Sequence, residues 1–124
     1  SRERDESMTV LVKTPCASAT LNFFGVTGTT WNDRTGKNVW DNTLRRNGFA
    51  VRSRLSALGS ATTVGAARPK IRKIASKDKD IIAFVARVDG HVLVIDRDGN
   101  TVVDTDPRKK DKRKMFGFVA VWKK

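Results

Sequence analysis

Three residues whose side chains suit nucleophilic catalysis stand far apart in this chain of 124 residues. Cys16 is its single cysteine and His91 its single histidine, and Asp104 follows His91 by thirteen residues. A cysteine attacks as a thiolate, an imidazole can take up the thiol proton, and a carboxylate can orient the imidazole and fix its tautomer. We therefore interpret Cys16 as a candidate nucleophile, His91 as its base and Asp104 as the residue that orients the histidine.

The residues around Cys16 favour a helix start. Thr14 can cap the free backbone N–H groups of a helix, and Pro15 suits the first helical position, where its missing N–H costs nothing. Cys16 would then stand in the first turn, where the partial positive charge of the helix stabilises an anion. Gly25 or Gly28 can end this helix.

The hydrophobic period changes to two after residue 80, which predicts strands in the C-terminal part of the chain. They are expected at 81–88, 91–96, 101–104 and 115–122. Asp89-Gly90 and Asp98-Gly99-Asn100 between them are typical of hairpin turns, because glycine tolerates positive φ. When the second turn folds back, His91 and Asp104 lie on neighbouring strands at the same end of the sheet.

The remaining patterns add helices and complete an α+β fold class, with N-terminal helices packed on a C-terminal antiparallel sheet. Helices are expected at about 36–47, with Asn47-Gly48 as the stop, and at about 63–75. Pro69 lies inside the second of these and argues against it. Residues 49–55 are predicted to form a short strand or an extended link.

Each candidate residue also has a purely structural interpretation. Cys16 can be a small core residue, and His91 can be a buried side chain that only supports the fold. Asp104 can be an ordinary turn or edge residue, since three nearby aspartates compete with it for the orienting role: Asp96, Asp98 and Asp106.

The composition bounds the domain organisation and the cofactors. We expect a charged flexible tail at 1–8 and one domain at 9–124. No apolar run is long enough to span a membrane, and the N-terminus lacks the apolar stretch of a signal peptide, so a cytoplasmic location and no membrane partner are expected. One cysteine and one histidine make no metal site, and no glycine-rich phosphate loop is present, so we expect no cofactor.

The chain is strongly basic. Lysine and arginine number 25 against 13 acidic residues, which gives a net charge of +12. Such a charge favours acidic proteins or nucleic acids as partners, although a solvated basic surface is the alternative. One basic run supplies candidate polyanion-binding residues, unless it is a solvated hairpin tip: Arg108, Lys109, Lys110, Lys112, Arg113 and Lys114.

The order of these features resembles the papain-like cysteine peptidases. The matching stretches are 14–20 and 90–104, and 35–41 resembles a segment of small phage-encoded proteins of this type. The resemblance extends over about residues 9–122. It implies a papain-like fold, a peptide or protein substrate, and host cytoplasm as the location of a phage-encoded member. It also implies Cys16 as nucleophile, His91 as general base and acid, and Asp104 as orienting residue.

One departure from that family concerns the oxyanion. Papain-like enzymes usually place a Gln or Asn several residues before the nucleophile as an oxyanion donor, and residues 8–13 contain neither. The backbone N–H of Cys16 is one candidate donor, and Thr9, Lys13 or Thr14 is a candidate for the other.

Three functions remain as hypotheses. The first is a cysteine-dependent hydrolase of a peptide, isopeptide or related amide that acts through a thioester. The second is a weak or inactive papain-like basic module, viral in origin, that binds a host protein or nucleic acid. The third is a transglutaminase-like or amidase-like enzyme, because the same triad serves several acyl donors. Rapid alkylation of Cys16 favours an enzyme, whereas salt-sensitive binding that survives Cys16→Ala favours the module.

Overall fold

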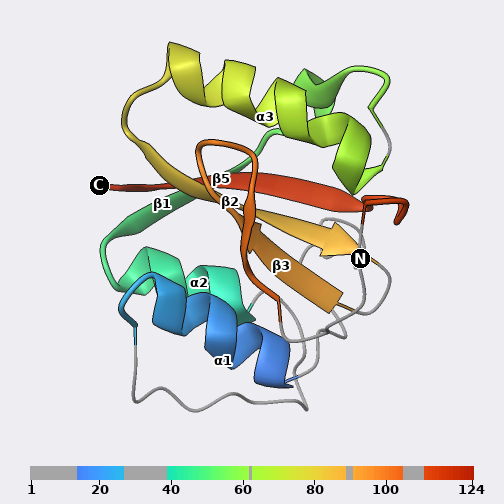
Figure 1. The fold of residues 1–124 in the computed structure, drawn as a ribbon. Helices are drawn as coiled ribbons and strands as arrows, with labels where there is room; N and C mark the ends of the chain where they lie inside the picture. Colours follow the sequence, from blue (N-terminus) through green and yellow to red (C-terminus); the bar gives the residue numbers. More distant parts are fainter. Residues whose placement is uncertain (1–13, 27–38, 62, 89–90, 105–110) are drawn as a thin grey trace.

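In the part of the chain that the computed structural model describes, five antiparallel strands form one sheet in the order β1-β5-β2-β3-β4 (Figure 1). The strands are Phe49–Ser53 (β1), Ile81–Val88 (β2), His91–Ile95 (β3), Thr101–Val103 (β4) and Gly117–Lys123 (β5). The structure describes residues 14–26, 39–61, 63–88, 91–104 and 111–124, and within these the side chains of 14–18 and 39–42 stay outside the description.

Helices cover both faces of the sheet, so the α+β class is confirmed. Figure 1 shows α1 (Thr14–Phe23) and α2 (Val39–Arg46) below the sheet and α3 (Val64–Lys77) above it. A short 3-10 helix, η2 (Leu55–Leu58), links β1 to the segment before α3. Residues 49–53 therefore form an edge strand that precedes α3. No described helix is long and apolar enough to cross a membrane.

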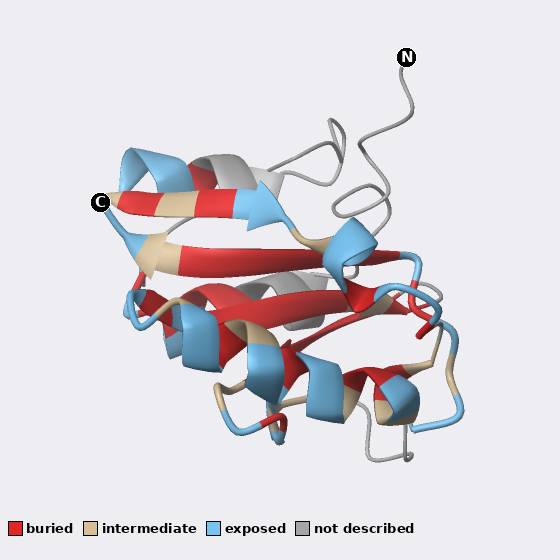
Figure 2. Ribbon diagram, turned by 90° about the horizontal axis from the view of Figure 1, so that it is seen from above, coloured by how far each residue is buried: buried red, intermediate tan, exposed pale blue. Residues whose placement is uncertain are grey.

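The two faces of the sheet carry separate hydrophobic clusters. On one face, Leu21 of α1 and Phe24, which directly follows that helix, pack over strand residues. On the other face, Ile71 of α3 packs with Phe84 and Phe118, whose rings stack 5.1 Å apart. Each such buried side chain stabilises the fold by about 1.5–3 kcal/mol. Because helices lie on both sides, all five residues of β3 are buried, and Figure 2 shows β2 and β5 buried over most of their length.

Glycines end the first two helices, as the sequence predicts. Gly25 has a φ of 80°, and the N–H groups of Gly25 and Val26 donate to the carbonyls of Asn22 and Leu21 at 2.9 and 3.0 Å. This is the Schellman arrangement, in which glycine takes the left-handed position. Gly48, with a φ of 91°, follows α2 in the same way.

Helix α3 forms despite its internal proline. The Thr63 hydroxyl caps it by accepting from the Ala66 N–H at 3.2 Å. Pro69 removes one helical hydrogen bond, yet the helix continues to Lys77. Tertiary packing outweighs the proline, since one side of the helix is buried on the sheet through Val64, Ala67, Ile71 and Ala75.

Candidate functional site

An imidazole–carboxylate pair, in which the histidine is buried and the aspartate partly buried, lies at one end of the sheet. The Nε2 atom of His91 is 2.6 Å from the Oδ1 atom of Asp104. The two side chains are 9% and 16% exposed. With the carboxylate ionised, the Nε2–H group donates a hydrogen bond to Oδ1 of Asp104, and this bond fixes the orientation of the ring. The structure therefore brings together the two residues that the sequence placed on neighbouring strands.

The β3–β4 hairpin positions this pair. His91 is the first residue of β3, and Asp104 directly follows β4. The ladder pairs Val94 with Val103, so the start of β3 and the end of β4 come to the same edge. The turn at the far end is fixed by Gly99, whose φ is 84°.

The structure also separates Asp104 from the competing aspartates. The Oδ1 atom of Asp96 accepts the backbone N–H groups of Asp98 and Asn100, both at 2.9 Å, so this carboxylate is engaged in the turn. Asp98 is exposed at the tip of that turn. Asp106 lies outside the described residues. Of the described aspartates, Asp104 is the one hydrogen-bonded to the histidine.

The hydrogen bond fixes which ring nitrogen faces the carboxylate. Nε2 lies toward Asp104, so Nδ1 lies on the other side of the ring.

Helix α1 brings the cysteine toward the same region. Cys16 is the third residue of α1, and α1 contacts both β3 and β4. Figure 1 shows the first turn of α1, the start of β3 and the end of β4 at the same end of the molecule. The side chain of Cys16 is outside the described part, so the predicted contact between its sulfur and His91 stays a prediction.

The other predicted site residues are placed only in part. Thr14 begins α1, with its side chain outside the description, and Thr9 and Lys13 lie outside the described residues. Arg108, Lys109 and Lys110 of the basic run are also outside. No group of three or more His, Cys, Asp or Glu side chains that could hold a metal ion occurs among the residues the structure describes.

The described end of the basic run is held against α3. The N–H groups of Val64 and Gly65 donate to the carbonyls of Arg113 and Asp111 at 3.0 and 2.9 Å. The Asp111 carboxylate also pairs with Arg68 at 2.7 Å. Lys112 and Lys114 are exposed. This part of the run therefore completes the start of α3 and is anchored at its backbone.

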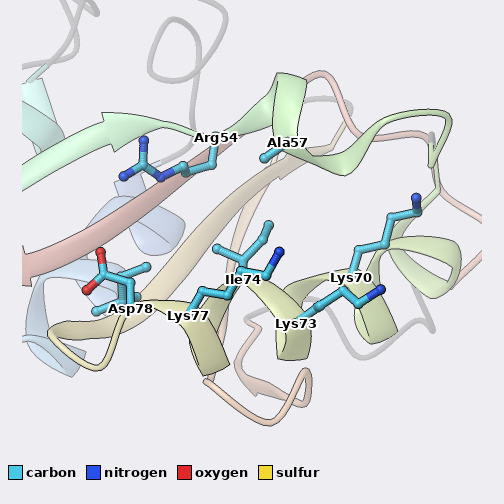
Figure 3. Close-up of a pocket in the computed structure, with 8 residues that line it drawn as sticks. Arg54, Ala57, Lys70, Lys73, Ile74, Lys77 and Asp78 are labelled. Carbon is cyan, nitrogen blue, oxygen red and sulfur yellow. The ribbon is translucent and has the colours of Figure 1, made fainter.

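A cationic pocket on the other side of the sheet was not predicted. It has a volume of about 450 Å³ and lies between α3 and the segment after β1 (Figure 3). Its lining residues are Arg54, Ala57, Lys70, Lys73, Ile74, Lys77, Asp78 and Ile81. The sequence held one signal for it, the spacing of Lys70 and Lys73 within the predicted helix 63–75, with Lys77 two residues beyond its predicted end.

Comparison with known proteins gives no relative. No family model matches the chain, and no curated protein or solved structure matches it.

Proposed function

We propose that the protein is a cysteine-dependent hydrolase of papain-like design, in which Cys16, His91 and Asp104 form the catalytic triad. Its substrate would be a peptide, isopeptide or related amide. The observation that carries this proposal is the part-buried His91–Asp104 pair, with Nε2 and Oδ1 2.6 Å apart, at the end of two strands that α1 also contacts.

The geometry of this pair supports a chemical role. The Asp104 carboxylate lies within hydrogen-bond distance of one ring nitrogen of a largely buried histidine and so orients the imidazole. A shielded imidazole held by a carboxylate is what a thiol needs as its base. The start of α1 adds a partial positive charge that favours a thiolate.

In such a triad the Cys16 sulfur must reach His91 from a particular side of the sheet. Helix α1 packs on the face that carries Val92 and Val94. His91 lies two and four residues before Leu93 and Ile95 along β3, so it falls on the same face of the sheet as they do. That face is the one covered by α3. Cys16 must therefore reach the imidazole past the end of the sheet, from the first turn of α1. That turn, not the apolar side of the helix, would form the site.

The reaction would proceed in two steps, formation of a thioester and its hydrolysis. The Cys16 thiolate adds to the substrate carbonyl carbon, and the protonated His91 gives its Nδ1 proton to the leaving nitrogen as the carbon–nitrogen bond breaks. The products of this step are a thioester and a free amine. Water then attacks the thioester, His91 takes one of its protons, and the acid leaves as Cys16 regains its thiolate. Asp104 keeps the ring oriented throughout, and the Cys16 N–H would be one oxyanion donor.

Alkylation of the native protein by iodoacetamide tests this proposal. The chain has a single cysteine, so one mass adduct reports Cys16 alone. We expect the rate of Cys16 alkylation to stay high from about pH 8 down to about pH 6, because the start of the helix and the imidazolium both stabilise the thiolate. The same protein in denaturant serves as the matched control with an ordinary thiol. A native profile that rises with pH as the denatured one does would contradict the triad.

A further inference from the structure

A second site lies on the side of the sheet covered by α3. Four cationic side chains line the pocket there, against one carboxylate, Asp78. Three of them, Lys70, Lys73 and Lys77, are exposed and follow each other at helical spacing along α3. A rise of about 1.5 Å per residue makes this row about 10 Å long.

The charges in this pocket lack internal compensation. Arg68 of the same helix pairs with Asp111 at 2.7 Å, whereas Lys70, Lys73 and Lys77 make no ion pair with any described residue. The Asp78 carboxylate accepts the Asp80 N–H at 3.1 Å. Like charges three and four residues apart on a helix repel one another. A pocket that gathers four cationic side chains against a single carboxylate therefore fits an anionic ligand.

The pocket also has an apolar part of its lining, and Trp122 packs on the same hydrophobic cluster as the lining residue Ile74. Ile81 forms part of its lining and pairs with Trp122 in the β2–β5 ladder. The guanidinium carbons of Arg52 and Arg54 lie 5.8 and 5.6 Å from the Trp122 ring centroid. Figure 3 shows Arg54 on the side of the pocket opposite the lysines of α3. Cations thus flank an apolar floor beside an indole.

We propose that this pocket binds single-stranded nucleic acid. The lysine row suits about two or three successive phosphates of a strand. The indole and its stacked guanidinium groups suit an unpaired base, which offers a flat face. An acidic peptide would use the charges but not the aromatic surface, and a duplex keeps its bases inside. The site is separate from the proposed triad and does not depend on it.

Binding of a labelled oligothymidylate of about twelve nucleotides, followed by fluorescence anisotropy between about 50 and 200 mM salt, tests the proposal. The pocket variant is Lys70→Gln/Lys73→Gln/Lys77→Gln. The matched control is Arg46→Gln/Lys123→Gln/Lys124→Gln, at exposed positions outside the pocket lining, which lowers the net charge of +12 by the same three units. Far-UV circular dichroism checks that both fold, and the three single pocket variants replace the triple one if it does not.

We expect the pocket variant to lose at least about tenfold in affinity, and its log–log salt slope to fall by about 2, since each phosphate contact contributes about 0.7. The control should lose clearly less, and Cys16→Ala should bind as the parent does. Equal losses in pocket and control variants would show that net charge alone attracts the strand and would overturn the site.

Two further measurements address the nature of the ligand. Trp122→Leu should weaken binding several-fold whereas Trp122→Phe keeps most of it, because stacking needs an aromatic ring. Polyglutamate that competes as well as oligothymidylate, or a duplex that binds more tightly, would overturn the assignment to single strands.

Discussion

The two ends of the β3–β4 hairpin use their polar side chains differently. At the turn end, Asp96 accepts backbone N–H groups, and Arg97 donates to the carbonyls of Ala75, Asp78 and Ile81. At the open end, the side chains of His91 and Asp104 bind each other. Side chains that satisfy backbone groups hold a fold together. A carboxylate hydrogen-bonded to an imidazole is the arrangement that orients a catalytic histidine. One hairpin thus provides a structural end and a candidate reactive end.

The largest expected effect is that of replacing His91, at the open end of the hairpin, on the reactivity of Cys16. His91→Ala should slow the alkylation of Cys16 on the order of a hundredfold at about pH 6, because the thiolate loses its imidazolium partner. The rate is measured by mass spectrometry on folded protein. The matched control is Arg97→Met at the turn end, which should leave the rate unchanged. Similar rates for His91→Ala and the parent would mean that the open end has no influence on the thiol.

Arg97→Met should have the next largest effect, on stability. Its guanidinium donates at 2.6 Å to the carbonyls of Ala75 and Ile81 and at 3.0 Å to that of Asp78. It also places a positive charge near the C-terminal end of α3, where the helix dipole is negative. We expect the free energy of unfolding to fall by about 2 kcal/mol, measured in urea. A change below about 0.5 kcal/mol would show that water replaces the guanidinium without loss.

Most of this hairpin was predictable because its signals are local. Alternating apolar residues and the Asp98-Gly99-Asn100 turn locate β3 and β4 to within one residue of the structure. Glycine is required at position 99 for two reasons. Its φ is 84°, and a Cβ atom there would lie 2.8 Å from the Arg68 carbonyl oxygen. The spacing between His91 and Asp104 then follows from antiparallel pairing.

Contacts between distant segments were not predictable. Nothing local to Arg97 indicates that it caps α3, since its three partners lie sixteen to twenty-two residues away. Pro69 argued against a helix that tertiary packing nevertheless stabilises. The cationic pocket needs Arg54 from the segment after β1 to face lysines of α3, and only the folded chain brings these together.

A smaller change is expected from Asp104→Asn at the open end. The amide keeps the size of the carboxylate and one acceptor oxygen but lacks its charge, so the ring stays oriented while an imidazolium is less stabilised. We expect the alkylation rate of Cys16 at about pH 6 to fall about tenfold, between those of the parent and His91→Ala. A fall as large as that of His91→Ala would instead indicate that the ring has moved. Crystallography of the variant would check this.

The smallest expected effect tests the turn end by itself. Asp96→Ala removes an oxygen that accepts two backbone N–H groups, at Asp98 and Asn100, both 2.9 Å away. These amides are near solvent, so water recovers part of the loss, and we expect unfolding to become easier by about 1 kcal/mol. Asp98→Ala is the matched control, because it removes the same charge from an exposed position in the same turn and should change stability by less than about 0.5 kcal/mol.

If both variants leave the reactivity of Cys16 at the parent level, the aspartates of the turn serve the fold, and orientation of the histidine rests with Asp104. If Asp96→Ala slowed alkylation as much as Asp104→Asn, the two ends of the hairpin would not be separable.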